Sequence, residues 1–164
     1  MPSDLSPFPA PRHDHARCIA EGLARAEAAC RDRHERLTEN RRAVLELLLA
    51  EHRPVGAYDI LERFDWKGRR PAPTQIYRAL AFLEALGLVH RIASRNAYVA
   101  CSGPGEGHGT VFLVCEQCGV VAEPDGADLG RTVHDLAGAT GFELRTHFLE
   151  ATGRCPECSR DDGA

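Results

Sequence analysis

Two pairs of cysteines constrain this chain more than any other feature of its sequence. The pairs are Cys115–Cys118 and Cys155–Cys158, each with two residues between its members, and 36 residues separate them. Four thiolates in a tetrahedron form a closed structural zinc site. The alternatives are two local redox dithiols or simply buried cysteines. The total of seven cysteines is odd, and without an evident export signal it favours metal or redox chemistry over disulfides. We therefore predict a structural zinc site at these four cysteines.

The residues around the two pairs predict a small β-α-β module. Strands are expected at 110–114 and 120–123, a helix over 129–137 that ends at Gly141, and a strand over 142–149 that leads into the second pair. The helix and the last strand account for the long gap between the pairs. A module of this size has a modest core, so metal binding would supply folding free energy that the core lacks.

The first two thirds of the chain predict a different module. Helices are expected over 12–36, from the N-cap Thr38 to about 52, over 57–64 and over 73–86, with Gly87 as the last C-cap. Two strands, 88–92 and 97–100, flank a turn and predict a hairpin. Helices followed by a two-stranded hairpin follow the order of a winged helix-turn-helix, in which the last helix reads the major groove of DNA. The predicted fold class is α+β.

Charge is distributed unevenly over the 164 residues. The net charge of −4 combines a middle segment, residues 36–99, with 11 Lys/Arg against 7 Asp/Glu, and a final segment, residues 100–164, with 4 against 11. This asymmetry indicates that the first module contacts a polyanion, although solvated surface charge alone could produce it. The apolar run 43–50 is interrupted by Glu46 and is too short for a membrane span. With no secretory signal evident at its start, the chain is expected to be intracellular and free of the membrane.

Candidate DNA contacts cluster on and around the predicted recognition helix. Arg78 is the best candidate for reading a base, because arginine forms bidentate hydrogen bonds with guanine. Contacts beside it are expected from Thr74, Gln75 and Tyr77. Contacts to the sugar-phosphate backbone, which position a protein without specifying sequence, are expected from Arg41, Tyr58, Arg69, Arg70 and Arg95. For the last three arginines, ordinary surface charge is the competing interpretation.

Several sequence elements together resemble the ferric uptake regulator superfamily, and within it the zinc uptake regulator branch. They are the string Pro73–Leu80 (PTQIYRAL), Val89-His90, Tyr98–Cys101 (YVAC) and the doubled C-x2-C, and the resemblance covers residues 12–158. It implies a homodimeric, zinc-responsive transcriptional repressor of zinc-uptake genes that binds a pseudo-palindromic double-stranded DNA operator in the cytoplasm. The implied domains are a disordered tail (1–11), a winged-helix DNA-binding domain (12–102), a hinge (103–109) and a dimerisation and metal-binding domain (110–164).

The resemblance also implies a second, regulatory zinc between the two modules, which makes two zinc ions per subunit. Its implied ligands are His90, Cys101, His108 and Glu123. Two imidazoles, a thiolate and a carboxylate suit a borderline-soft ion such as zinc. Because these residues come from both modules, zinc bound to them would fix how the modules are oriented.

Three other functions compete with this interpretation. A redox sensor would release DNA when thiols are oxidised, and an iron or manganese sensor would prefer harder ligands than Cys101. A zinc hydrolase would keep an open coordination position for water. Four candidate ligands, no separate general base and no nucleophile motif or phosphate loop argue against an enzyme or a small-molecule substrate.

Overall fold

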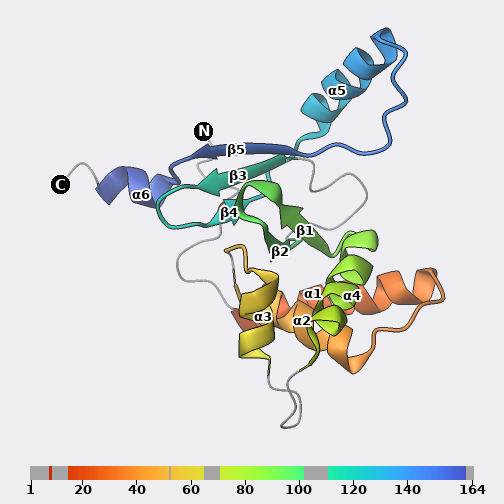
Figure 1. Cartoon of the computed structure of the whole chain (residues 1–164). Coiled ribbons are helices and arrows are strands. Elements are labelled where there is room, and N and C mark those ends of the chain that lie inside the picture. Colours follow the sequence, from red (N-terminus) through yellow and green to blue (C-terminus); the bar gives the residue numbers. More distant parts are fainter. Residues whose placement is uncertain (1–7, 9–14, 52, 65–70, 102–110, 162–164) are drawn as a thin grey trace. The chain divides into compact units, whose positions relative to one another are not determined.

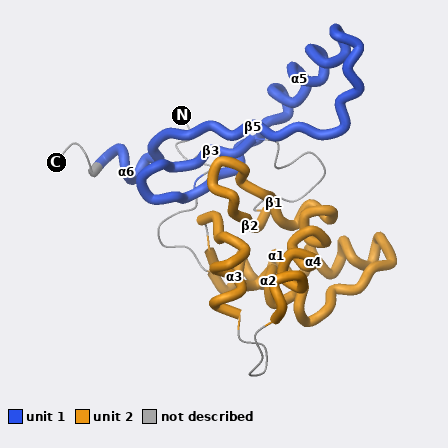
Figure 2. The backbone as a smooth tube through the Cα atoms, viewed as in Figure 1, with its two compact units in different colours: residues 1–9, 103–164 blue, residues 10–102 orange. Residues whose placement is uncertain are grey.

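The computed structural model describes residues 8, 15–51, 53–64, 71–101 and 111–161. These residues belong to two compact units, one formed by 15–101 and the other by Phe8 with 111–161 (Figure 2). The expected hinge, most of the expected tail and the loop 65–70 lie outside the described residues. Within the described parts, none of the helices has the length and apolar character that crossing a membrane requires.

The N-terminal unit consists of four helices followed by a hairpin (Figure 1). The helices are α1 (His15–Asp32), α2 (Glu39–Leu49), α3 (Ala57–Arg63) and α4 (Pro73–Ala85). Strands β1 (Val89–Ile92) and β2 (Ala97–Ala100) form the hairpin, with the short 3-10 helix η1 (Ala93–Arg95) between them. This order confirms the predicted winged helix-turn-helix.

Local signals in the sequence explain where α2 and α4 begin and where α4 ends. The Thr38 hydroxyl accepts a hydrogen bond from the Arg41 amide at 3.4 Å and caps α2. Pro73 occupies the first turn of α4, where a missing N–H costs nothing. Gly87 follows α4 with φ +69°, a backbone conformation that glycine adopts readily and that ends the helix.

The hairpin packs as an antiparallel ladder in the register Val89↔Ala100 to Ile92↔Ala97. Asn96 takes a left-handed conformation, φ 47°, which closes the tight turn. Val55, between α2 and α3, bridges Tyr98 through two main-chain hydrogen bonds of 2.8 and 2.9 Å. The wing is therefore joined to the helices by main-chain bonds as well as by side-chain packing.

One apolar core holds this unit together. Its fully buried members come mainly from α2 and α4; they are Val44, Leu45, Leu48, Ile60, Ile76, Leu80, Leu83 and Val89. Each large aliphatic side chain buried in this way contributes about 1.5–3 kcal/mol. This core fixes the exposed face of α4 relative to the wing.

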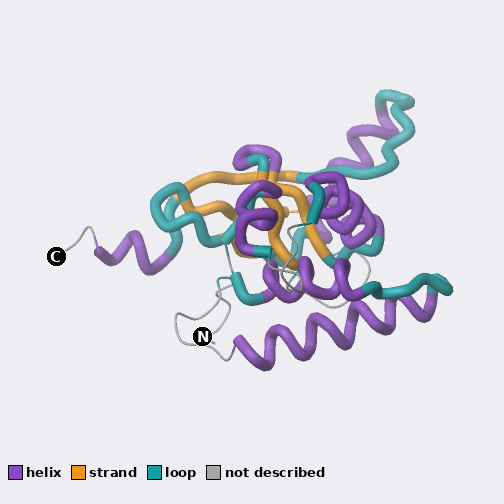
Figure 3. The backbone as a smooth tube through the Cα atoms, turned by 60° about the horizontal axis from the view of Figure 1, so that its bottom comes forward, coloured by secondary structure: helices purple, strands orange, loops and turns teal. Residues whose placement is uncertain are grey.

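The C-terminal unit is built on a three-stranded sheet. Its elements are β3 (Val111–Cys115), β4 (Val121–Ala122), α5 (Ala127–Ala139), β5 (Leu149–Gly153) and α6 (Pro156–Asp161). The strand order is β4-β3-β5, with β4 antiparallel and β5 parallel to the central strand. Figures 1 and 3 both show α5 and the loop after it extending away from one end of this sheet.

The prediction of a strand over 142–149 was wrong, because the strand begins only at Leu149. Residues 142–148 have no regular structure, and β3 already pairs with β4 on one edge and β5 on the other. Among the described residues of this unit, the alternating Phe142, Leu144, Thr146 and Phe148 therefore have no strand to pair with. Phe142 and Phe148 are 64% and 58% exposed, so they do not form part of its core.

Candidate metal centres and DNA-binding surface

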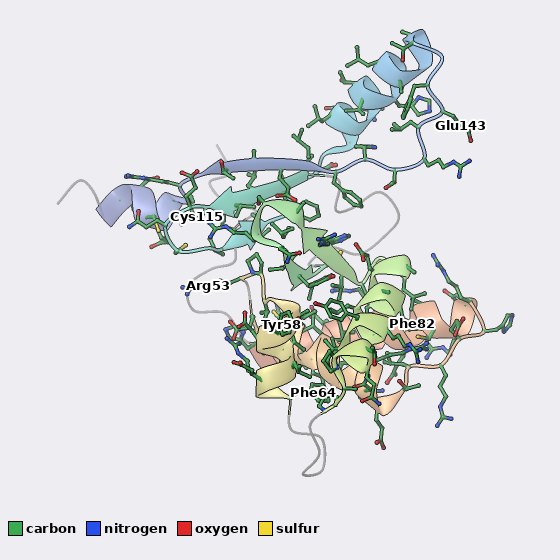
Figure 4. All side chains as sticks on the ribbon, viewed as in Figure 1. Arg53, Tyr58, Phe64, Phe82, Cys115 and Glu143 are labelled. Atoms are coloured by element: carbon green, nitrogen blue, oxygen red, sulfur yellow. The ribbon has the colours of Figure 1, made fainter. Side chains whose placement is uncertain are left out.

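The four cysteines of the two C-x2-C pairs converge in the C-terminal unit. Cys115 ends β3 and Cys118 follows in the adjoining turn, while Cys155 follows β5 and Cys158 lies in α6. Parallel pairing places Cys115 opposite Gly153, which delivers the second pair to the first. All four sulfur atoms lie within 4.8 Å of one another, and sulfur atoms gather near Cys115 in Figure 4.

These distances fit a tetrahedral zinc site. A zinc–sulfur bond of about 2.3 Å implies sulfur atoms about 3.8 Å apart around one ion. The Cys118 and Cys155 Sγ atoms are 3.7 Å apart. Four thiolates leave no coordination position for water or substrate, so the donor set suits a structural ion.

Main-chain amides favour the thiolate form of one cysteine in this cluster, and a thiolate attracts a cation. Burial alone raises the pKa of the Cys115 thiol, but main-chain hydrogen bonds from Cys118, Cys155 and Gln117 outweigh it and lower the pKa to about 6. One of them, from the Cys155 amide to the Cys115 Sγ, spans 3.3 Å. For Cys158, burial and then the neighbouring sulfur atoms raise the pKa to about 12. A thiolate is thus already favoured at Cys115, whereas deprotonation of Cys158 needs a nearby cation.

The cluster is also shielded from solvent. Cys115, Cys155 and Cys158 are 1%, 3% and 6% exposed, and the half-buried Phe8 and Val120 pack against them. Phe8 comes from the segment expected to be a disordered tail, and nothing in the local sequence pattern identifies it as a packing residue. It could be found only from the tertiary structure.

A second pair of possible metal ligands lies on the wing of the N-terminal unit. His90 is in β1, Cys101 directly follows β2, and their ligand atoms lie within 4.8 Å of each other. Both residues are 8% exposed. Among the described residues, His90 is the only polar or charged one classed as buried. Burial of an imidazole beside a thiol is unusual for packing alone and suits a zinc ligand pair.

The two other implied ligands are located differently. Glu123 directly follows β4 in the C-terminal unit and is half-buried. His108 lies outside the described residues. The four-residue regulatory site therefore stays a prediction, of which the N-terminal unit brings two members together.

The first turns of α4 form the exposed face expected to read DNA. Thr74, Gln75, Tyr77 and Arg78 are all exposed, and Tyr77 retains 45% of its accessible surface. Gln75 also has a local role, because its side-chain oxygen accepts a hydrogen bond from the Ala72 amide at 2.8 Å. This is one half of a capping box, which a glutamine at the third helical position indicates.

The residues expected to contact the DNA backbone differ in their exposure and in their contacts within the protein. Tyr58 in α3 is 69% exposed (labelled in Figure 4), and Arg95 is exposed at the wing turn. The Arg41 guanidinium instead lies 3.2 Å from the ring centroid of Phe82 and donates to the Arg36 carbonyl at 2.6 Å. A contact between Arg41 and DNA stays a prediction. The contacts with Phe82 and Arg36 also give this side chain a structural role. Arg69 and Arg70 lie outside the described residues.

Removing metal from the cysteine cluster should destabilise the C-terminal unit selectively. We expect a Cys155→Ser variant, or the wild-type protein treated with a strong chelator, to lose a tightly bound zinc ion and the cooperative unfolding of this unit, because the closed loop loses its cross-link. Zinc content by native mass spectrometry and thermal unfolding measure both effects. Cys18→Ser, at a half-buried cysteine of α1 outside the cluster, is the matched control. Equal stability of Cys155→Ser and Cys18→Ser would contradict a structural metal.

Comparison with known proteins identifies the family. The model of the ferric uptake regulator family matches residues 32–152. The zinc uptake regulation protein of Escherichia coli is 37% identical over 84% of this chain and 81% of its own length. The peroxide operon regulator of Bacillus subtilis is 27% identical over 87% of this chain and 97% of its own. A zinc uptake regulator complexed with zinc and DNA has a similar structure, with a TM-score of 0.81, 34% identity, and coverage of 89% of this chain and 98% of that one. The chain belongs to the ferric uptake regulator family.

Proposed function

We propose that this chain is a zinc-responsive transcriptional repressor that binds operator DNA as a homodimer and represses zinc-uptake genes in the cytoplasm. The observation that carries the proposal is the buried pair of His90 and Cys101 on the wing of a winged helix. A metal ligand pair built into a DNA-binding wing connects ion binding to DNA binding. Similarity to the zinc uptake regulators supports zinc as the ion.

We propose two zinc ions per subunit with separate roles. The four cysteines hold one ion whose loss unfolds its surroundings, so it cannot serve as a signal. His90, Cys101, His108 and Glu123 hold the other. When bound there, zinc would supply a positive charge that two imidazoles, a thiolate and a carboxylate coordinate together. His90 and Cys101 bring the wing to that centre, and Glu123 brings the C-terminal unit.

The thiolate ligand argues for zinc over iron or manganese. Manganese and ferrous iron favour oxygen and nitrogen donors, whereas Cys101 adds a soft sulfur donor that zinc accepts.

Because coupling between two binding sites is reciprocal, zinc that strengthens DNA binding is itself held more tightly when DNA is bound. This reciprocity gives the proposal a quantitative test.

DNA binding should depend on zinc through Cys101. We expect buffered free zinc to raise the operator affinity of the wild-type protein about 5- to 150-fold, the usual range for coupling between sites. Cys101→Ser should remove most of this gain while the cysteine cluster keeps its zinc. Fluorescence anisotropy with labelled operator, titrated at fixed free zinc, measures the effect, with iron and manganese as controls. Zinc-independent binding, or binding lost only on oxidation with zinc retained, would overturn the proposal.

We propose that Arg78 reads a base from the exposed face of α4. Arg78→Ala should weaken operator binding by about 1–3 kcal/mol and relax the preference at one base position, because a bidentate contact to guanine is lost. Competition with operators substituted at single positions measures this change. Arg95→Ala, at the exposed wing turn, serves as the comparison and should weaken operator and random DNA alike. A similar uniform loss for Arg78→Ala would contradict base reading.

The dimer is supported by apolar surface that the C-terminal unit leaves uncovered. The described residues include seven exposed large hydrophobic residues, and five lie on α5, the loop after it or β5: Leu129, Leu136, Phe142, Phe148 and Leu149. No residue of α5 is buried, although Leu129, Val133 and Leu136 share one helical face. A patch of this kind marks a protein interface. A second copy of the chain is the occupant that a pseudo-palindromic operator requires.

A charge placed in this patch should dissociate the dimer. Leu136 is 65% exposed, so Leu136→Asp removes little packing within one chain. We expect the variant to be folded but monomeric at concentrations where the wild type is dimeric, because pairing would bury an unpaired carboxylate. Leu136→Met keeps an apolar side chain and should remain dimeric. Sedimentation velocity distinguishes the two variants, and a dimeric Leu136→Asp protein would place the interface elsewhere.

A further inference from the structure

A long-range hydrogen bond joins the first helix to the residue proposed as the regulatory thiolate. The Arg25 side chain in α1 donates from Nη2 to the Cys101 carbonyl oxygen at 2.8 Å, and the bond is partly buried. Both residues belong to the N-terminal unit, and 76 positions separate them in the sequence. The family model begins at residue 32, so Arg25 lies outside the segment that it matches.

Helix α1 is held firmly enough to direct this side chain. Its buried residues Gly22, Ala26 and Cys30 recur every fourth position and form one face against the core. At Gly22 a Cβ atom would lie 2.5 Å from the Leu49 Cδ2, which is closer than real carbon atoms approach. The backbone of α1 therefore sits directly on α2, and Arg25 extends from a fixed base.

Hydrogen bonds hold both main-chain polar groups of Cys101. Its amide donates to the Leu88 carbonyl at 2.9 Å, which extends the pairing of the wing strands, and its carbonyl accepts from Arg25. Anchoring the peptide groups on both sides of the Cα atom restricts the direction of the Cα–Cβ bond. Within the wing, this anchoring fixes the thiol relative to His90, whose ligand atom is within 4.8 Å.

We infer that Arg25 is a positioning residue for the regulatory zinc site, acting through the main chain of Cys101. The inference rests on the proposed function, since it takes Cys101 as a zinc ligand. Groups that orient metal ligands without touching the metal typically change its affinity 10- to 100-fold when they are removed. For Arg25 we expect a loss of zinc affinity at the lower end of this range. A cavity of about 80 Å³ beside Arg25 and Cys101 could admit a water molecule that partly replaces the guanidinium.

The chain offers a matched control for this contact. Arg33, just after α1, makes the same kind of bond, donating from Nη1 to the Ala85 carbonyl at the end of α4 at 2.9 Å. Both bonds join the first helical segment to a main-chain oxygen of the N-terminal unit. Only the bond from Arg25 ends on a proposed metal ligand.

The experiment compares zinc affinity in full-length Arg25→Ala, Arg25→Lys, Arg33→Ala and wild-type protein, each with the cysteine cluster loaded. Competition with a chromophoric chelator gives the affinity of the second zinc. Titration with cobalt gives the thiolate-to-cobalt absorption of the second site, with Cys101→Ser as the baseline. Thermal unfolding without the second metal shows what each substitution does to the fold itself.

We expect Arg25→Ala to weaken the second zinc about tenfold and to alter the cobalt spectrum. Arg25→Lys, which keeps a cationic donor, should recover part of the affinity, and Arg33→Ala should match the wild type. Equal zinc affinities for Arg25→Ala and Arg33→Ala would overturn the inference, as would a loss of thermal stability without a change in zinc affinity. If Arg25→Ala does not fold, Arg25→Met, which keeps the aliphatic stem but cannot donate a hydrogen bond, takes its place; wild-type zinc affinity with an unchanged cobalt spectrum in that variant overturns the inference too. A wild-type protein without a second, thiolate-bound metal would instead refute the proposed function.

Discussion

The pairing of β5 with β3 is the constraint on which the C-terminal unit depends. The two strands run parallel, so their carboxyl ends lie side by side, and the register ends at Cys115 opposite Gly153. One C-x2-C pair lies at each of these ends, and the four thiols meet there. Parallel strands need a crossover connection. The long segment between the two cysteine pairs provides it, with α5 as its helix.

That crossover leaves the unit with an unusual distribution of apolar surface. The sheet buries Phe112 and Val114 of β3, while five large apolar side chains of α5 and residues 142–149 stay exposed. The structure of one chain thus separates two tasks. Cysteines and central strand residues stabilise the unit, and the crossover carries the apolar surface proposed to pair with another chain. Among the described residues of the N-terminal unit, the exposed large hydrophobic side chains are instead Tyr58 and Tyr77, on α3 and α4.

Features encoded over short stretches of sequence could be predicted. Thr38 as the cap of α2, Gly87 at the end of α4 and the spacing within each cysteine pair all depend on residues a few positions apart. The strand expected over 142–149 was misplaced because an alternating pattern does not show which strand, or which chain, will pair with it. The helix α6 was missed, since Pro156–Asp161 is too short to show a period.

The roles of individual side chains were harder to predict where a partner is distant in sequence. Arg41 has the composition of a phosphate contact, but the Phe82 ring, 41 positions away, lies under its guanidinium. Phe8 packs on cysteines more than 100 positions later. No periodic pattern encodes such pairs, because they arise only when packing of the core brings separate helices or strands together.

The two candidate metal sites differ in how completely one unit builds them, and this difference matches their proposed roles. The C-terminal unit supplies all four thiols of the cysteine site, so its affinity for zinc depends on the folding of that unit alone. The N-terminal unit supplies only His90 and Cys101 to the proposed regulatory site, and two ligands hold zinc much less tightly than four. The affinity of that proposed site must then depend on whether Glu123 and His108 also bind the ion. Whether they do depends in turn on how the two units are arranged. A site whose last ligands arrive only when the units take one arrangement can report on zinc concentration. A site whose ligands all come together when one unit folds cannot.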